Sequence, residues 1–323
     1  MVITAGSPHT PVMLGEVLAG LSPKDGGIYV DGTFGNGGYS RAVLEAAQCK
    51  VYGIDRDPGV VARAQEMETE FKDRFFIIEG RFGSVAELLA SHSVGPVDGV
   101  AFDIGVSSMQ IDTPERGFSF RTDGPLDMRM ESAGTSASDI VNNMEETDLV
   151  GIIRELGEER FARRVAAAIV AARTQEPILR TLQLAEIVRR VVPKSKDGID
   201  PATRTFQALR ILVNDELGEI DRGLVGAEQV LAPGGRLCVV SFHSLEDRLI
   251  KRFFKTRSGD TPQPSRHMPQ SSIQGPQPTF KMVVKKSITP TKNEQRTNPR
   301  ARSARLRIGE RTAAPAWNKE EAA

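Results

Sequence analysis

A glycine-rich segment between a predicted strand and a predicted helix is the first place where this sequence could do chemistry. It runs from Asp31 to Tyr39 and carries four glycines in seven residues, which allows tight turns and a close backbone approach to a ligand. The helix that follows offers free N–H groups and a positive dipole end, which suit a carboxylate or a phosphate. A dinucleotide loop would need a third glycine where Ser40 stands. The segment therefore predicts a nucleotide-type ligand of another class.

An acid at the end of the next predicted strand narrows the ligand class. Asp55 follows Asp31 by 24 residues, a position at which a carboxylate accepts hydrogen bonds from ribose hydroxyls. The glycine loop together with Asp55 resembles the first two motifs of class I methyltransferases. This resemblance implies S-adenosylmethionine as the cofactor, with its ribose on Asp55 and its methionine part over residues 37–39.

Two further residues lie at or just after the C-terminal ends of predicted strands, where ligands bind in open α/β sheets. Phe82 could stack on an adenine ring or could belong to the core. Asp103 could accept hydrogen bonds from an exocyclic amine as it attacks the methyl group. Alternatively, the backbone carbonyls of residues 104–105 take that role and Asp103 binds the ammonium group of the cofactor. The sequence leaves both pairs of alternatives open.

The scarce cysteines and histidines exclude several kinds of site. Methylation at C5 of a pyrimidine needs a cysteine nucleophile, and neither Cys49 nor Cys238 lies in a loop that we expect to be catalytic. The four histidines show no metal-ligand spacing, so no metal site is predicted. His243 follows a predicted strand and either contacts the substrate or caps the turn. We take Asp103 and His243 as the candidate catalytic residues.

Short apolar runs and helical patterns alternate along the first hundred residues. Strands separated by helices of this length imply right-handed βαβ units and a parallel sheet. The predicted strands of this part are residues 28–31, 50–55, 74–79 and 97–104. Helical periodicity then covers 138–150, 158–173, 181–191 and 202–231. Strand patterns return at 236–242, 280–288 and 304–308.

These patterns predict an α/β fold: a class I, Rossmann-like methyltransferase sheet that is interrupted by an all-helical subdomain. We expect the cofactor-binding methyltransferase domain at 1–108 and 212–312, and the inserted substrate-recognition subdomain at 109–211. Residues 258–279 contain five prolines and are predicted to form a flexible loop. The tail at 313–323 is predicted to be disordered.

A net charge of zero hides an uneven distribution of charge. Residues 241–312 hold 16 Lys and Arg against 5 Asp and Glu, which predicts contact with a polyanion on one side of the protein. No stretch of 18 uncharged apolar residues occurs, and the first residues lack a basic segment followed by an apolar run. We therefore expect neither a membrane helix nor a secretory signal. With only two cysteines, the chain is predicted to be cytoplasmic.

Many segments, in order along nearly the whole chain, resemble the MraW/RsmH family. Members of this family are bacterial methyltransferases that modify N4 of a decoding-centre cytidine in 16S ribosomal RNA. The matching segments are 9–12, 31–40, 54–57, 103–108, 116–120, 124–130, 158–162, 201–210, 241–248 and 298–303.

The resemblance implies a cytoplasmic enzyme, a helical insertion that helps to hold RNA, and a set of cofactor contacts. Those contacts fall on Gly37, Gly38, Tyr39, Asp55, Phe82, Asp103 and Gln110. The family usually has His where Tyr39 stands. A contact made by the backbone N–H tolerates tyrosine, whereas a contact made by an imidazole would be lost. The implied substrate is 16S rRNA within an assembled or assembling small subunit, and the sequence leaves a homodimer open.

Five arginines are the candidates for contacts with RNA phosphates and bases. They are Arg129, Arg204, Arg210, Arg300 and Arg302. Arg305 and Arg307 extend the basic run, although alternation along a strand would place the run on one solvated face. A DNA amino-methyltransferase is a rival function, but it would carry a Pro-Pro-aromatic motif where residues 104–106 read Ile-Gly-Val. A non-catalytic RNA-binding module is a second rival, and the intact glycine loop with Asp55 disfavours it.

Overall fold

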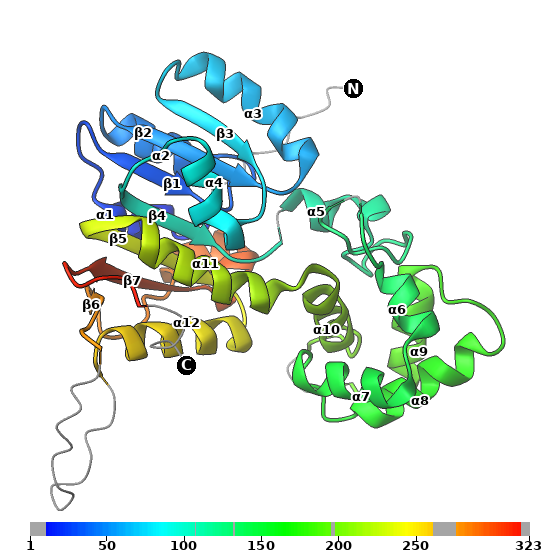
Figure 1. Ribbon diagram of the computed structural model, residues 1–323. Helices are drawn as coiled ribbons and strands as arrows, with labels where there is room; N and C mark the ends of the chain where they lie inside the picture. Colours follow the sequence, from blue (N-terminus) through cyan, green and yellow to red (C-terminus); the bar gives the residue numbers. More distant parts are fainter. Residues whose placement is uncertain (1–10, 107, 132, 195–197, 261–275, 318–323) are drawn as a thin grey trace, which may run out of the picture. The chain divides into compact units, whose positions relative to one another are not determined.

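The protein is divided into two compact units in a computed structural model, which describes residues 11–106, 108–131, 133–194, 198–260 and 276–317 (Figure 1). The sheet unit comprises Met1–Gly105 and Gly218–Ala323, and the helical unit comprises Val106–Leu217. Several predictions fall outside the described residues: the matching positions 9, 10 and 107, most of the proline-rich loop, and the end of the tail.

One seven-stranded sheet organises the sheet unit, in the order β3-β2-β1-β4-β5-β7-β6. The first five strands are parallel, and β7 runs antiparallel between β5 and β6. This sheet confirms the predicted Rossmann-like α/β class. The strands are β1 (Ile28–Asp31), β2 (Lys50–Asp55), β3 (Phe75–Glu79), β4 (Val97–Asp103), β5 (Leu231–Ser241), β6 (Phe280–Met282) and β7 (Arg305–Arg311).

The register of the central strands brings three acidic residues to one edge of the sheet. Asp31 at the end of β1 pairs with Gly53 of β2 and with Ala101 of β4. Asp55 and Asp103 each lie two residues beyond those partners, at the ends of their own strands. Parallel strands end at a common edge, so the fold gathers the three carboxylates there.

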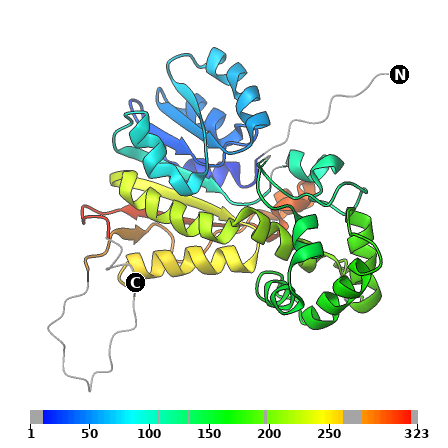
Figure 2. The same ribbon diagram turned by 45° about the vertical axis from the view of Figure 1, so that its right-hand side comes forward.

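Helices cover both faces of the sheet. Figures 1 and 2 show α4, α11 and α12 side by side over one face, with α1 and α2 on the other. Glycines of α11 allow close packing on the segment after β3, since a Cβ at Gly226 would lie 2.7 Å from Val85. The helices of the sheet unit are α1 (Leu14–Leu21), α2 (Gly38–Ala46), α3 (Pro58–Glu70), α4 (Val85–Ser91), α11 (Glu216–Val230), α12 (Ser244–Arg257) and α13 (Lys292–Thr297).

The helical unit has an apolar core of its own. Leucine, isoleucine, valine and alanine side chains at helical spacing meet in it, among them the fully buried Leu149, Ile169 and Leu184. The predicted single helix at 138–150 is wrong, because the backbone is extended at Met144 and divides it into two. The helices are α5 (Ser108–Asp112), α6 (Ala137–Asn143), α7 (Glu146–Glu155), α8 (Ala162–Arg173), α9 (Thr181–Val191) and α10 (Thr203–Asn214).

The predicted long helix at 202–231 is also two helices. Asp215 adopts a left-handed backbone conformation, with φ of 48°, and ends α10 before α11 begins. Aspartate tolerates this conformation better than most residues. Side chains on both sides of the break hold it, because Arg210 donates to both carboxylate oxygens of Glu216. Helical periodicity continues through a break of one residue, which is why the pattern did not reveal it.

The C-terminal segment departs from the prediction in three ways. The expected strand at 280–288 is only three residues long. Arg300 and Arg302 lie in a 3-10 turn, Pro299–Ser303, and only Arg305 and Arg307 lie in β7, so the alternative that one strand face carries all four arginines does not hold. Arg307 is 8% exposed and donates to both oxygens of Asp247 on α12, which makes it a structural residue rather than a solvated one.

The predicted disordered tail is placed as far as Trp317. The guanidinium carbon of Arg257 lies 4.1 Å from the centre of the indole ring. The indole Nε1–H of Trp317 donates to the carbonyl of Gln277. Arg257 is itself paired with the buried carboxylate of Glu228. Disorder at 313–317 was therefore the wrong expectation, since an aromatic ring covers a buried ion pair there. Among the described residues, no helix combines the length and the apolarity needed to cross a bilayer.

Candidate active site

Asp31 ends β1 and ties the first turn of α2 to it. The N–H and the hydroxyl of Ser40 donate to Asp31 Oδ2 at 3.2 and 2.8 Å. The other oxygen, Oδ1, is fully buried and has no hydrogen-bond partner among the described residues. Burial raises the pKa of this carboxyl to about 6, although the Ser40 hydrogen bonds act in the opposite direction. A buried carboxylate with one free oxygen suits a ligand that brings a positive charge or a donor.

The glycine loop leaves no room for side chains at two of the predicted cofactor positions. Gly37 precedes α2 with φ of 71°, in the left-handed region that favours glycine. A Cβ added at Gly38 would lie 2.0 Å from Cγ of Pro11. A side chain at Gly37 would meet Met67 and Phe34 at 2.7 Å, so at either position the loop or its neighbours would have to shift.

Tyr39 uses its side chain to hold the N-terminal part of the chain. The ring is buried, and its hydroxyl donates to the carbonyl of Val12, just before α1. Burial raises the pKa of the phenol well above its usual value. This leaves the backbone N–H of Tyr39, in the first turn of α2, as the group that a ligand can contact. The departure from the family pattern is therefore compatible with a cofactor contact made by the backbone.

Asp55 fastens the glycine loop from the end of β2, a role that sequence reasoning missed. Its Oδ2 accepts from the N–H of Gly35 at 2.8 Å, and its Oδ1 accepts from the N–H of Asp57 at 2.9 Å. Burial raises the pKa of this carboxyl. Each carboxylate oxygen can accept more than one hydrogen bond, so ribose hydroxyls could bind beside the two backbone donors.

Phe82 opens the turn after β3 and makes the core contacts that were one of its two predicted roles, whereas stacking on adenine stays a prediction. Its half-buried ring packs on Phe102, with the ring centres 5.1 Å apart. On another side it meets α11, where a Cβ added at Gly223 would lie 2.6 Å from the ring. The ring is thus anchored in the core and also retains an exposed part.

Asp103 lies at the end of β4, beside the glycine loop. Its N–H donates to the hydroxyl of Thr33 at 2.6 Å, which joins the end of β4 to the glycine loop. Its Oδ1 is fully buried without a hydrogen-bond partner among the described residues. Burial, followed by the nearby carboxyls of Asp31 and Glu246, raises the pKa of Asp103 to about 8. In the part of the chain that the structure describes, neither Asp31 nor Asp103 forms an ion pair with a Lys or an Arg.

His243 has the capping role that was one of its two predicted roles. It is the N-cap residue of α12, and its Nδ1 accepts from the N–H of Glu246 at 3.5 Å. Glu246 is fully buried, and its Oε2 accepts from the N–H groups of Phe242 and His243 at 2.7 and 3.1 Å. A substrate contact by His243 stays a prediction. The reciprocal cap fixes the Glu246 carboxyl, whose charge helps to raise the pKa of Asp103.

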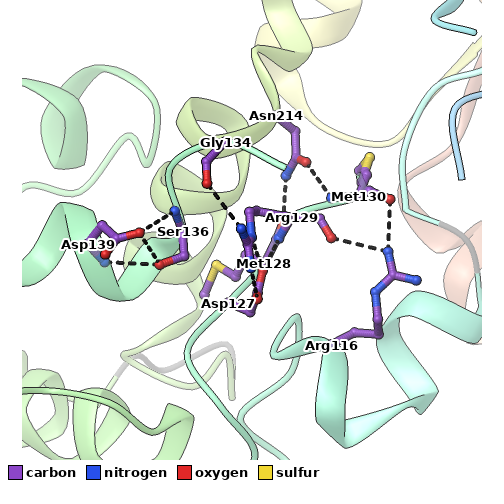
Figure 3. A network of polar contacts seen from close by, with 9 residues as sticks. All are labelled: Arg116, Asp127, Met128, Arg129, Met130, Gly134, Ser136, Asp139 and Asn214. Atoms are coloured by element: carbon purple, nitrogen blue, oxygen red, sulfur yellow. Dashed lines mark hydrogen bonds and ion pairs between the residues drawn. The ribbon is translucent and has the colours of Figure 1, made fainter. Parts of the chain in front are cut away.

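The predicted RNA contacts Arg129 and Arg210 are held by carboxylates within the helical unit. Arg129 donates through Nε and Nη2 to both oxygens of Asp127, at 2.8 and 2.7 Å (Figure 3). Arg210 forms the same forked pair with Glu216, which is 6% exposed. An arginine bound in this way must leave its partner before it can hold a phosphate with the same donors.

The segment that carries Arg129 is fixed by its backbone. Asn214 accepts from the N–H of Met130 and donates to the carbonyl of Met128, both at 2.8 Å. Arg116 donates to the carbonyls of Arg129 and Met130, and Figure 3 shows the two side chains reaching the segment from different elements. Met128 has φ of 64°, a conformation that needs such support in a residue other than glycine.

The remaining predicted residues differ in their exposure. Gln110 is buried in α5 of the helical unit. Arg204, in the first turn of α10, is exposed. Arg302 is exposed as well, whereas Arg300 is half-buried. Within the sheet unit, the structure brings together the glycine loop, Asp55, Phe82 and Asp103 at the C-terminal edge of the strands.

The family model and the relatives that are most similar in sequence agree with one another. The model of the MraW methylase family matches residues 6–312. Ribosomal RNA small subunit methyltransferase H of Paramagnetospirillum magneticum is 61% identical over 310 residues, which cover 96% of this chain and 98% of that protein. The protein of the same name from Rhodospirillum centenum is 58% identical over 321 residues, covering 99% and 97%. Among solved structures, an rRNA methylase from Streptococcus thermophilus covers 95% of this chain and 99% of its own, with 11% identity and a TM-score of 0.39.

Proposed function

Because the chain belongs to the MraW methylase family, we propose that it transfers a methyl group from S-adenosylmethionine to the N4 amine of a decoding-centre cytidine in 16S ribosomal RNA. The named relatives support a substrate in the RNA of the small subunit. The cytidine and its N4 atom are the finer part of the proposal, and the family resemblance of the sequence motifs suggests them. Such a substrate also supports the expected location in the cytoplasm.

The observation that carries the cofactor assignment is the pair of buried carboxyls beside the glycine loop. Asp31 and Asp103 each keep one buried oxygen without a partner, and Lys and Arg of the described residues form no ion pair with them. Burial of unpaired carboxylates costs free energy, which a cationic ligand would offset. S-adenosylmethionine brings two positive charges, a sulfonium and an ammonium, together with a ribose for Asp55.

When bound, S-adenosylmethionine supplies an electrophilic methyl group on a positively charged sulfur. In one of two arrangements, Asp103 or the backbone carbonyls of residues 104–105 accept hydrogen bonds from the cytidine amine and hold its nitrogen in line for attack. The ionised Asp103 could then take the proton that the amine loses when the N–C bond forms and the S–C bond breaks. In the other arrangement, Asp103 holds the ammonium group and the carbonyls alone orient the amine.

The RNA would have to present its cytidine outside the base stack, which costs a few kcal/mol in base-flipping enzymes. Exposed arginines on both units support a polyanionic partner: Arg204 in the helical unit and Arg302 in the sheet unit. Neither forms an ion pair within the described residues, so their charge is available to phosphates. Arg129 and Arg210 stay candidates that would first have to exchange their carboxylate partners.

A methyl-transfer assay with labelled cofactor tests the proposal. We would compare intact small subunits, protein-free 16S rRNA and duplex DNA, and then locate the label by nucleoside analysis. Label in N4-methylcytidine of rRNA is the expected result. Label in DNA alone would support the rival amino-methyltransferase, and no incorporation into any substrate would favour the non-catalytic RNA-binding module.

A further inference from the structure

A buried glutamate on α11 holds the turn after β3. Glu219 is 2% exposed, and its Oε2 accepts from the backbone N–H of Gly83 at 3.1 Å. Its other oxygen, Oε1, is 2.6 Å from Arg222 Nη2 and 3.7 Å from Arg81 Nη1. A carboxylate this well buried is costly unless it is paired, and here two guanidinium groups offset the cost. The arginines thus stabilise an acceptor that is directed at one backbone N–H of the turn.

Phe82, the neighbour of Gly83, is placed by α11 as well. One turn along the helix from Glu219, Gly223 offers bare backbone to the Phe82 ring, and a Cβ added there would lie 2.6 Å from it. The Glu219 carboxylate lies against the backbone of Gly83, since a Cβ at that position would lie 2.8 Å from Glu219 Oε2. Phe102 limits the ring on another side, with 5.1 Å between ring centres. Two neighbouring residues of the turn are therefore fixed from one helix, one by a hydrogen bond and one by shape.

We propose that Glu219 and Gly223 are positioning residues for the cofactor: they act through Phe82, by holding its ring where it can stack on the adenine. The proposal rests on the assignment of S-adenosylmethionine to this site. It goes further by giving the adenine end a support that comes from α11, far from β3 in the sequence. Neither residue has to touch the cofactor.

A double-mutant cycle separates positioning from general stability. We would measure the affinity for S-adenosylhomocysteine and for 5′-methylthioadenosine, which lacks the amino-acid part, by calorimetry. Glu219→Ala should lower the affinity for both ligands about tenfold, the equivalent of about 1.4 kcal/mol. Glu219→Gln keeps one acceptor oxygen and should recover part of that loss. In the Phe82→Ala background, Glu219→Ala should change either affinity less than about twofold, because the ring through which it acts is gone.

A second variant and a control complete the test. Gly223→Ala should weaken both ligands in the same way, since its new methyl group displaces the Phe82 ring. Asp221→Asn is the matched control, because Asp221 lies on the same helix with an exposed side chain. Equal losses for Glu219→Ala with and without Phe82 would overturn the positioning role and leave a structural one. If the wild-type protein bound neither ligand, the cofactor assignment itself would fail, and the inference with it.

Discussion

Binding of S-adenosylmethionine should become tighter as the pH rises, because the free protein holds a proton on Asp103. Burial and the neighbouring carboxyls raise the pKa of Asp103 to about 8, so most molecules carry the neutral acid at pH 7. A cationic ligand favours the ionised carboxylate and must displace this proton. If only the ionised form binds, the apparent dissociation constant is multiplied by one plus ten to the power of pKa minus pH.

With a pKa of about 8, this relation gives an affinity about 25-fold higher at pH 7.5 than at pH 6.0. Asp31, with a pKa of about 6, would add about twofold over the same interval. The upper limit of pH 7.5 keeps the amino group of the cofactor largely protonated. Titration calorimetry at the two pH values, in buffers with different ionisation enthalpies, measures both the affinity and the release of the proton.

Asp103→Asn is the matched variant, because the amide resembles the neutral acid in shape and cannot ionise. Because it mimics the form that does not bind, it should have a low affinity for S-adenosylmethionine at both pH values, with only the smaller pH dependence from Asp31. S-adenosylhomocysteine, which retains the ammonium but not the sulfonium, separates the two open roles: a shared pH dependence assigns Asp103 to the ammonium. Wild-type affinity that does not change between pH 6.0 and 7.5, or an equal change in the variant, would refute the reasoning.

The same carboxyl should make the cofactor-free protein less stable as the pH rises. The folded-state pKa lies above the ordinary value of 3.8, so the folded protein binds this proton more tightly than the unfolded chain does. Its contribution to stability is complete below the ordinary value and is lost as the pH rises through about 8. The melting temperature should therefore fall between pH 6 and pH 8, and Asp103→Asn should reduce that fall.

Three further predictions concern other parts of the chain. Asp55→Ala should weaken the binding of S-adenosylhomocysteine at least about tenfold in calorimetry. Asp55→Asn should weaken it less, because the carboxylate also holds the glycine loop. Unchanged affinity in both variants would exclude the ribose contact. Arg302→Ala should lower the slope of log RNA affinity against log salt concentration by about 0.7 to 0.9. Arg210→Ala should mainly destabilise the fold, since Glu216 loses its partner. Equal salt slopes for Arg302→Ala and the wild type would mean that Arg302 is a solvated residue without an RNA contact. Asn214→Ala should cost about 1–3 kcal/mol in urea unfolding, because two buried backbone groups lose their partner, and a smaller loss would mean that Arg116 alone holds that segment.

The sequence predicted the sheet and its binding edge well because short-range patterns encode both. Strands β1 and β2 have the predicted bounds, and the acids at their ends are recognisable from strand position alone. Helix ends were harder to predict. Asp215 breaks a helix without interrupting its apolar periodicity, so only the backbone conformation reveals the break.

Contacts between residues far apart in the sequence were not predictable from spacing. Glu219 lies 136 residues after the N–H that it binds, in a helix whose sequence reads as an ordinary amphipathic surface. Arg307 looked like part of a basic run until its ion pair with Asp247 placed it in the interior. The arginines of the predicted RNA surface cannot be sorted by sequence, because an ion pair and a phosphate contact require the same residue type.

The position of β7 has a consequence for synthesis on the ribosome. The last strand lies between β5 and β6, where it pairs with residues 236–241 on one side and with Phe280–Met282 on the other. Translation proceeds at about 5 to 20 residues per second and N-terminal parts fold first. The edge of β5 must therefore remain unpaired until residues 305–311 have been made and have left the ribosome. During that interval it is a strand edge open to intermolecular pairing, so the arrival of β7 is the step that protects the nascent protein from aggregation at this edge.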